Sequence, residues 1–94
     1  MPTLTKTFLV GKWTHADWSL ELTMFNYLVI TWPNGAKAYG AWVLREDEVL
    51  LTYHHEGKGN KNIYLFAVEE ILDENRISTR DVERNKEEVL VREV

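Results

Sequence analysis

Three histidines, His15, His54 and His55, are the residues of this chain best suited to bind a metal ion. His54 and His55 are neighbours, so on a strand their side chains would point to opposite faces and could not share one metal in regular geometry. The helical metal signature H-E-x-x-H is absent from the sequence. The chain has no cysteine, which excludes Cys-ligated zinc, thiol chemistry and disulfides. We therefore expect no metal site and no cofactor.

Nucleophilic and acid–base catalysis find little support in the sequence. The two serines, Ser19 and Ser78, lie within predicted strands, and neither is part of a G-x-S-x-G elbow. Glu21 would suit acid–base chemistry only if both faces of its strand were covered. Its apolar neighbours alternate with it and place it on the outward face, where a charge discourages edge-to-edge pairing. We expect the protein not to be an enzyme.

The charge balance excludes one class of partner. Eleven Lys and Arg against fifteen Asp and Glu give a net charge of −4, whereas a nucleic-acid binder needs a basic face. No apolar run approaches the length of a membrane span. The apolar run near the start is only Phe8, Leu9 and Val10, which is too short for a signal peptide. We expect a cytoplasmic protein that contacts neither nucleic acid nor membrane.

The elements that must position any site have a hydrophobic period of two residues. From position 18 to position 24, apolar and polar residues alternate, which predicts a half-buried strand with Trp18, Leu20, Leu22 and Met24 facing inward. Comparable segments predict about eight strands, over residues 8–14, 18–24, 27–32, 36–44, 49–54, 63–71, 76–82 and 89–92. Residues 81–91 also contain good helix formers, which leaves a short C-terminal helix as an alternative.

A hairpin turn is predicted at Pro33, Asn34 and Gly35. Proline ends the preceding strand because it cannot donate to the ladder. Asn-Gly is typical of a type I′ turn, since both residues tolerate the positive φ that this turn requires. Trp32 and Ala36 should then lie next to each other beside the turn.

Ninety-four residues and about eight short strands predict one domain over residues 1–94. The fold class is all-β, a single antiparallel β-barrel or flattened sandwich. Four Trp, four Tyr and three Phe should leave its interior mostly filled. The main architectural alternative is the five-stranded OB-fold, in which Tyr53, Tyr64 and Phe66 would stack on bases. The number of predicted strands and the acidic charge count against it.

Gly11-Lys12-Trp13, at the start of the first predicted strand, carries a family resemblance. A G-x-W followed by an antiparallel meander resembles the lipocalins and the wider calycin group, in particular their short lipocalin-like domains. The resemblance implies a barrel whose closed end is covered by the tryptophan, with a basic residue late in the chain lying over the indole. Arg92 is the candidate for that role and Arg84 is a second one. An arginine in this position would make a cation–π contact.

The G-x-W pattern is repeated at Gly40-Ala41-Trp42. Two copies are too few for a solenoid or propeller. We interpret the repeat as a packing device, in which glycine permits the close approach of a neighbouring backbone and the tryptophan covers the gap.

These observations favour a small non-enzymatic binding module with an apolar pocket at the open end of a lipocalin-like barrel. Its expected ligand is small and apolar, and the expected lining residues are Leu20, Leu22, Ile30, Trp42, Leu51 and Phe66. The alternative is a protein-interaction module, such as an inhibitor or immunity-type protein, that acts through its surface. Trp32, Tyr39 and Trp42 would mark a contact surface if they were exposed together. A homodimer is also expected if open sheets leave edges to pair.

Overall fold

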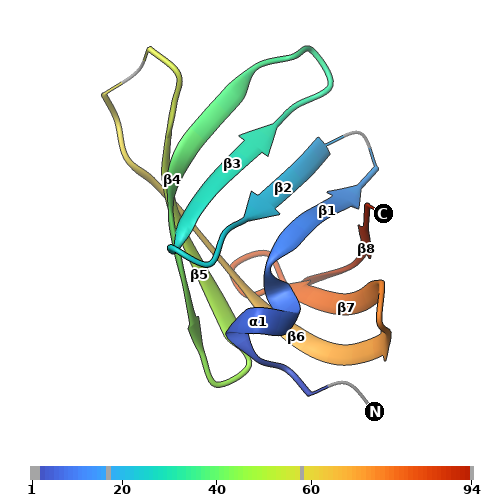
Figure 1. Cartoon of the computed structure of the whole chain (residues 1–94). Coiled ribbons are helices and arrows are strands. Elements are labelled where there is room, and N and C mark those ends of the chain that lie inside the picture. The colour runs from blue at the N-terminus through green and yellow to red at the C-terminus, as the bar shows by residue number, and fades with distance from the viewer. Residues whose placement is uncertain (1–2, 17, 58, 94) are drawn as a thin grey trace.

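The computed structural model describes residues 3–16, 18–57 and 59–93. Eight consecutive antiparallel strands follow one helical turn, and the last strand pairs with the first to close a barrel (Figure 1). The all-β barrel prediction is confirmed. The elements are α1 (Lys6–Leu9), β1 (Gly11–His15), β2 (Trp18–Leu22), β3 (Tyr27–Thr31), β4 (Lys37–Arg45), β5 (Glu48–His55), β6 (Asn62–Asp73), β7 (Arg76–Asp81) and β8 (Lys86–Arg92).

The start of the chain differs from the prediction, because Phe8 belongs to helix α1 and not to the first strand. Thr5 caps this helix, and its hydroxyl accepts a hydrogen bond from the Phe8 backbone N–H at 3.1 Å. Leu9 is fully buried against the barrel. A local cap and one buried side chain thus favour a helical turn where the apolar pattern alone indicates a strand.

Met24 is also placed differently from the prediction. Strand β2 ends at Leu22, and the backbone N–H of Asn26 donates to the Thr23 carbonyl at 3.1 Å to form a turn. Asn26 has a positive φ of 67°, which asparagine tolerates better than most residues. The chain therefore leaves the sheet before Met24, whose side chain is 47% exposed.

The hairpin at Pro33 has a different turn from the predicted type I′. Only Gly35 of the Asn-Gly pair has a positive φ, at +85°, and its N–H donates to the Trp32 carbonyl at 2.9 Å. Pro33 and Asn34 are therefore the central residues of the turn, a position that suits the fixed φ of proline. The predicted proximity of Trp32 and Ala36 is confirmed, because the Trp32 N–H donates to the Ala36 carbonyl at 2.9 Å.

The C-terminal helix alternative is wrong, because residues 86–92 form strand β8 along β7. The OB-fold alternative is likewise excluded by the order of eight strands. Every strand pairs with a neighbour on each side, although β1 and β8 meet in only two residue pairs. The homodimer stays a prediction.

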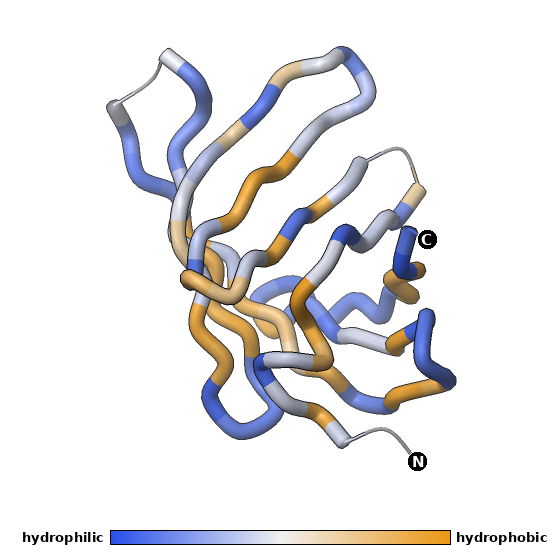
Figure 2. Tube along the Cα trace, in the orientation of Figure 1, coloured by the Kyte–Doolittle hydropathy of each residue, from blue (hydrophilic) through white to orange (hydrophobic). Residues whose placement is uncertain are grey.

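The core is continuous and receives a buried apolar side chain from α1 and from every strand. Figure 2 shows the hydrophobic residues concentrated along the strands and the hydrophilic residues in the connecting loops. Within the described ranges, the structure has no helix long and apolar enough to cross a membrane.

Because the strands alternate in direction, the barrel has two distinct ends. We call the end with α1 and the turn at residues 23–26 the closed end. The opposite end, with the connections that follow β1, β3, β5 and β7, is the open end (Figure 1).

Candidate functional site

Arg92 covers Trp13 at the closed end, as the resemblance implies. Its guanidinium carbon lies 4.3 Å from the centroid of the indole ring. Its Nη1 and Nη2 donate to the carbonyls of Val10 and Phe8, at 2.8 and 2.6 Å. Gly11 has a φ of +137°, and a Cβ at this position would lie 2.9 Å from Arg92 Nη1. These residues close and stabilise the barrel.

Arg84, the second candidate for this role, lies at the other end of the barrel, so that prediction is wrong. It belongs to the turn after β7, where its Nη1 is 3.4 Å from Asp81 Oδ2.

Trp42 completes the closed end together with the turn at residues 23–26. Its indole N–H donates to the Thr23 carbonyl at 2.9 Å, and Asn26 Nδ2 donates to the Trp42 carbonyl at 2.8 Å. Two residues earlier, a Cβ on Gly40 would lie only 1.9 Å from the carbonyl oxygen of Thr52 on β5. The predicted use of glycine for close backbone approach is confirmed at Gly40.

A cavity of about 190 Å³ lies at the open end of the barrel. Its wall combines apolar, aromatic and charged side chains that come from β2, β3, β5, β6, β7, β8 and two of the connecting turns. The lining residues are Trp18, Ile30, Trp32, Leu51, Tyr53, Tyr64, Asp81, Arg84 and Glu88.

The six residues predicted to bind a ligand divide into two groups. Ile30 and Leu51 line this cavity. The other four, which fill the core rather than the cavity wall, are Leu20, Leu22, Trp42 and Phe66. All six are buried.

Aromatic rings form much of the cavity wall and pack on one another. Trp32 lies 4.9 Å from the ring of His55 and 6.4 Å from the ring of Tyr53, between centroids. On the neighbouring strand β2, the ring of Trp18 packs edge-on against His15 at 5.7 Å. These contacts hold flat apolar faces around the opening, an arrangement that suits a planar ligand.

The side of the cavity formed by β7 and β8 carries two inward-facing carboxylates, Asp81 and Glu88. Asp81 is only 3% exposed, and its Oδ1 accepts the backbone N–H groups of Glu83 and Arg84 at 3.0 and 3.1 Å. Glu88 Oε2 lies 3.6 Å from His15 Nε2, across the seam between β8 and β1.

Tyr64 reports on this acidic wall through its pKa. Burial, and then the negative charges of Asp81 and Glu88, raise the pKa of Tyr64 above the ordinary 10.0. Because the pKa of Tyr64 is higher in the folded state than in the unfolded state, protonated Tyr64 stabilises the fold at pH values below the unfolded-state pKa. This contribution is lost as the pH rises through the folded-state pKa. Burial also raises the pKa of Tyr53, so in an alkaline titration of phenolate absorbance Tyr64→Phe should reduce the high-pH phase by one tyrosine. An unchanged high-pH phase in this variant would contradict the burial of Tyr64 beside the two carboxylates.

Sequence reasoning did not assign Trp18, Trp32, Asp81 or Glu88 to the site, although it placed Trp18 on the inward face of its strand. Inward positions in β7 alternate from Ile77, and the same alternation reaches Asp81. If the inward alternation were continued to the polar residues at the ends of strands, it would identify Asp81 as an inward-facing residue. Glu88 has no such signal, because the three apolar residues of β8, Val89, Leu90 and Val91, are consecutive and do not show which face is buried.

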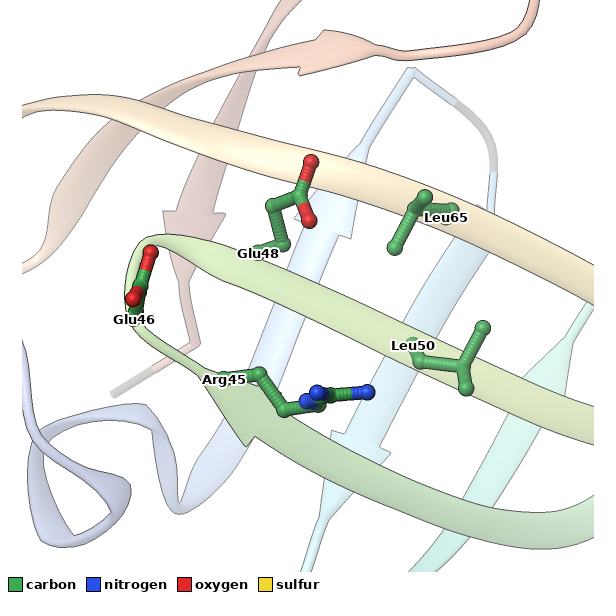
Figure 3. Close-up of a pocket in the computed structure, with 5 residues that line it drawn as sticks. All are labelled: Arg45, Glu46, Glu48, Leu50 and Leu65. Carbon is green, nitrogen blue, oxygen red and sulfur yellow. The ribbon is translucent and has the colours of Figure 1, made fainter.

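A second hollow, of about 380 Å³, lies on the outer face of β4, β5 and β6. Leu50 and Leu65 pair across β5 and β6 within it, and Arg45, Glu46 and Glu48 flank them at the β4–β5 turn (Figure 3). This outer groove is separate from the barrel interior.

The predicted aromatic contact surface of Trp32, Tyr39 and Trp42 does not form, because Trp42 is buried in the core whereas Tyr39 faces outward and is 41% exposed. In residues 3–16, 18–57 and 59–93, no three His, Asp or Glu side chains lie together so that they could hold a metal ion.

Fold and site together define a closed eight-stranded antiparallel β-barrel, compatible with a lipocalin-like fold, that has an aromatic cavity at its open end. Comparisons with protein-family models, with curated proteins and with solved structures found no match.

Proposed function

We propose that the protein is a binding module that takes up a small, flat, largely apolar ligand at the open end of the barrel. The observation that carries this proposal is the cavity itself, which the buried side chains of Ile30 and Leu51 line together with the rings of Trp18, Trp32 and Tyr53. An open concavity lined by aromatic side chains and a few polar groups is the usual form of a small-molecule site.

The volume of the cavity limits how much of a ligand it can enclose. Pockets for drug-sized molecules have volumes of about 300–1,000 Å³, whereas an apolar cavity of about 150 Å³ holds benzene. At about 190 Å³, the open-end cavity suits a molecule built on one ring with a short substituent.

We propose binding without chemical conversion. The described lining residues include no Ser, Thr, Cys or Lys that would serve as a nucleophile. The Asp81 carboxylate, the most buried acid of the site, is engaged by two backbone N–H groups of its own turn. The Asp81 carboxylate therefore stabilises the turn after β7.

The cytoplasmic location that the sequence suggests stays a prediction.

Two tyrosines on neighbouring strands provide a matched test of this function. Tyr53 on β5 faces the cavity, whereas Tyr39 on β4 faces outward. With benzyl alcohol as the probe, calorimetric titration should show binding to the wild type that Tyr53→Ala weakens about three- to tenfold, the size expected for the loss of one aromatic contact. Tyr39→Ala should bind as the wild type does. Equal effects of the two substitutions, or no binding to any of the proteins, would overturn the proposal.

The outer groove favours a second candidate function, a protein-interaction module. Leu50 and Leu65 lie there beside Val43, which is itself exposed, and charged side chains surround them as at the rim of an interface. A partner that the wild type retains at equal stoichiometry and that Leu65→Arg loses would support this function. Retention that is unaffected by Leu65→Arg would exclude the groove as its site.

A further inference from the structure

We propose that the open-end cavity selects ligands whose ring carries a positively charged nitrogen, such as an arylalkyl ammonium. This inference rests on the proposed function and adds the charge of the ligand to it. It is carried by the combination of aromatic faces on one side of the cavity with two inward-facing carboxylates on the other.

The charged groups of the cavity are unequal in sign. Asp81 and Glu88 supply two carboxylates, and Arg84 supplies the one guanidinium among the described lining residues. Arg84 is held only loosely, because its side chain is 76% exposed and its contact with Asp81 Oδ2 is 3.4 Å long. A cationic ligand can therefore displace this side chain toward solvent without breaking a strong ion pair.

Glu88 is the carboxylate best placed to receive the ligand. Its side chain is 15% exposed, and its Oε2 is 3.6 Å from His15 Nε2, beyond hydrogen-bond distance. Asp81 differs, because the backbone N–H groups of Glu83 and Arg84 already engage its Oδ1. Glu88 thus retains acceptor capacity in a setting shielded from water, where a charge pair is stronger than on the surface.

The aromatic wall points to the same ligand class. The faces of tryptophan and tyrosine attract a cation through the ring quadrupole. Trp32 and Tyr53 come from one side of the opening, and the acidic residues of β7 and β8 come from the other. The negative charges of Asp81 and Glu88 also act on the Tyr64 hydroxyl on the neighbouring strand β6, since both raise its pKa.

Three probes of similar shape and different charge test whether the cavity prefers a cation: benzylammonium, benzyl alcohol and benzoate. Calorimetric titration at neutral pH should give an affinity for benzylammonium about tenfold higher than for benzyl alcohol, which corresponds to about 1.4 kcal/mol. Benzoate should bind weakest. Raising the salt concentration should reduce this preference only in part, because the carboxylates are shielded.

Three variants test which residues cause the preference for benzylammonium. Glu88→Gln should abolish the preference for benzylammonium over benzyl alcohol. The control is Glu87→Gln, because Glu87 is the neighbouring glutamate, its side chain is 62% exposed, and it pairs with Arg80 outside the cavity. This control should keep the tenfold preference. Arg84→Gln should raise the affinity for benzylammonium about threefold, since it removes the competing cation.

The outcomes distinguish the two proposals. Binding of benzyl alcohol as tightly as benzylammonium, or a tenfold preference that survives in Glu88→Gln, would overturn the charge selectivity and leave the binding function standing. Failure of all three probes to bind the folded wild type would overturn both.

Discussion

Replacing Arg92 with alanine is expected to lower the free energy of unfolding by about 3 kcal/mol or more. The guanidinium donates to the carbonyls of Phe8, Val10 and Glu74 and lies over the indole of Trp13. Its loss removes these charge-assisted hydrogen bonds and leaves carbonyls at the closed end without their donor. For a domain of this size, the melting temperature should fall by about 12–24 °C.

Arg84→Ala is the control for this substitution, because Arg84 is largely exposed and makes one long contact. Its melting temperature should stay close to that of the wild type. Arg92→Lys should be intermediate, since a lysine ammonium cannot reach several carbonyls at once as the planar fork of arginine does. Thermal unfolding followed by circular dichroism measures all three. Equal stability of Arg92→Ala and Arg84→Ala would contradict the closing role of Arg92.

Gly40→Ala is expected to be about as damaging, at about 3 kcal/mol or more. The new Cβ would lie 1.9 Å from the Thr52 carbonyl oxygen and 2.6 Å from Tyr53 Cα, both backbone atoms of β5. Backbone atoms in a paired ladder cannot turn aside as a flexible side chain does. Strands β4 and β5 must therefore separate, and they form the longest pairing of the barrel.

Gly59→Ala provides the control, because a Cβ there has no neighbour within 4 Å. Its effect should stay within about 0.5 kcal/mol, as for surface substitutions in general. Urea unfolding at constant m-value compares the two variants. A Gly40→Ala protein with the unfolding midpoint of the wild type would show that β4 and β5 do not approach each other in the register described.

The strand pattern predicts much of the fold because a two-residue period reports directly on which face is buried. It correctly identifies Leu20 and Leu22 as inward, and the G-x-W resemblance correctly pairs Arg92 with Trp13. It fails at Phe8 and Met24, where a helix cap and a tight turn determine the local structure. Such local hydrogen bonds leave only a weak trace in hydrophobic periodicity.

The candidate site is less predictable than the fold, because inward alternation does not give the height of a residue along the barrel axis. Leu22 and Ile30 face the same interior, but Leu22 pairs with Leu28, one inward position nearer the closed end, and only Ile30 reaches the cavity. Polar inward residues such as Asp81 belong to the ends of strands, where the pattern weakens. The position of the strand ends relative to one another depends on the register of all eight strands around the ring.

A proton–nitrogen correlation NMR titration with benzyl alcohol tests the binding function most directly, because the four tryptophans report on both ends of the barrel. Trp18 and Trp32 line the cavity, whereas the indole N–H groups of Trp13 and Trp42 donate to backbone carbonyls at the closed end. We predict saturable shifts of the Trp18 and Trp32 indole signals, with those of Trp13 and Trp42 unchanged. Shifts of similar size in all four signals, or no saturable shift in any, would contradict a ligand site at the open end.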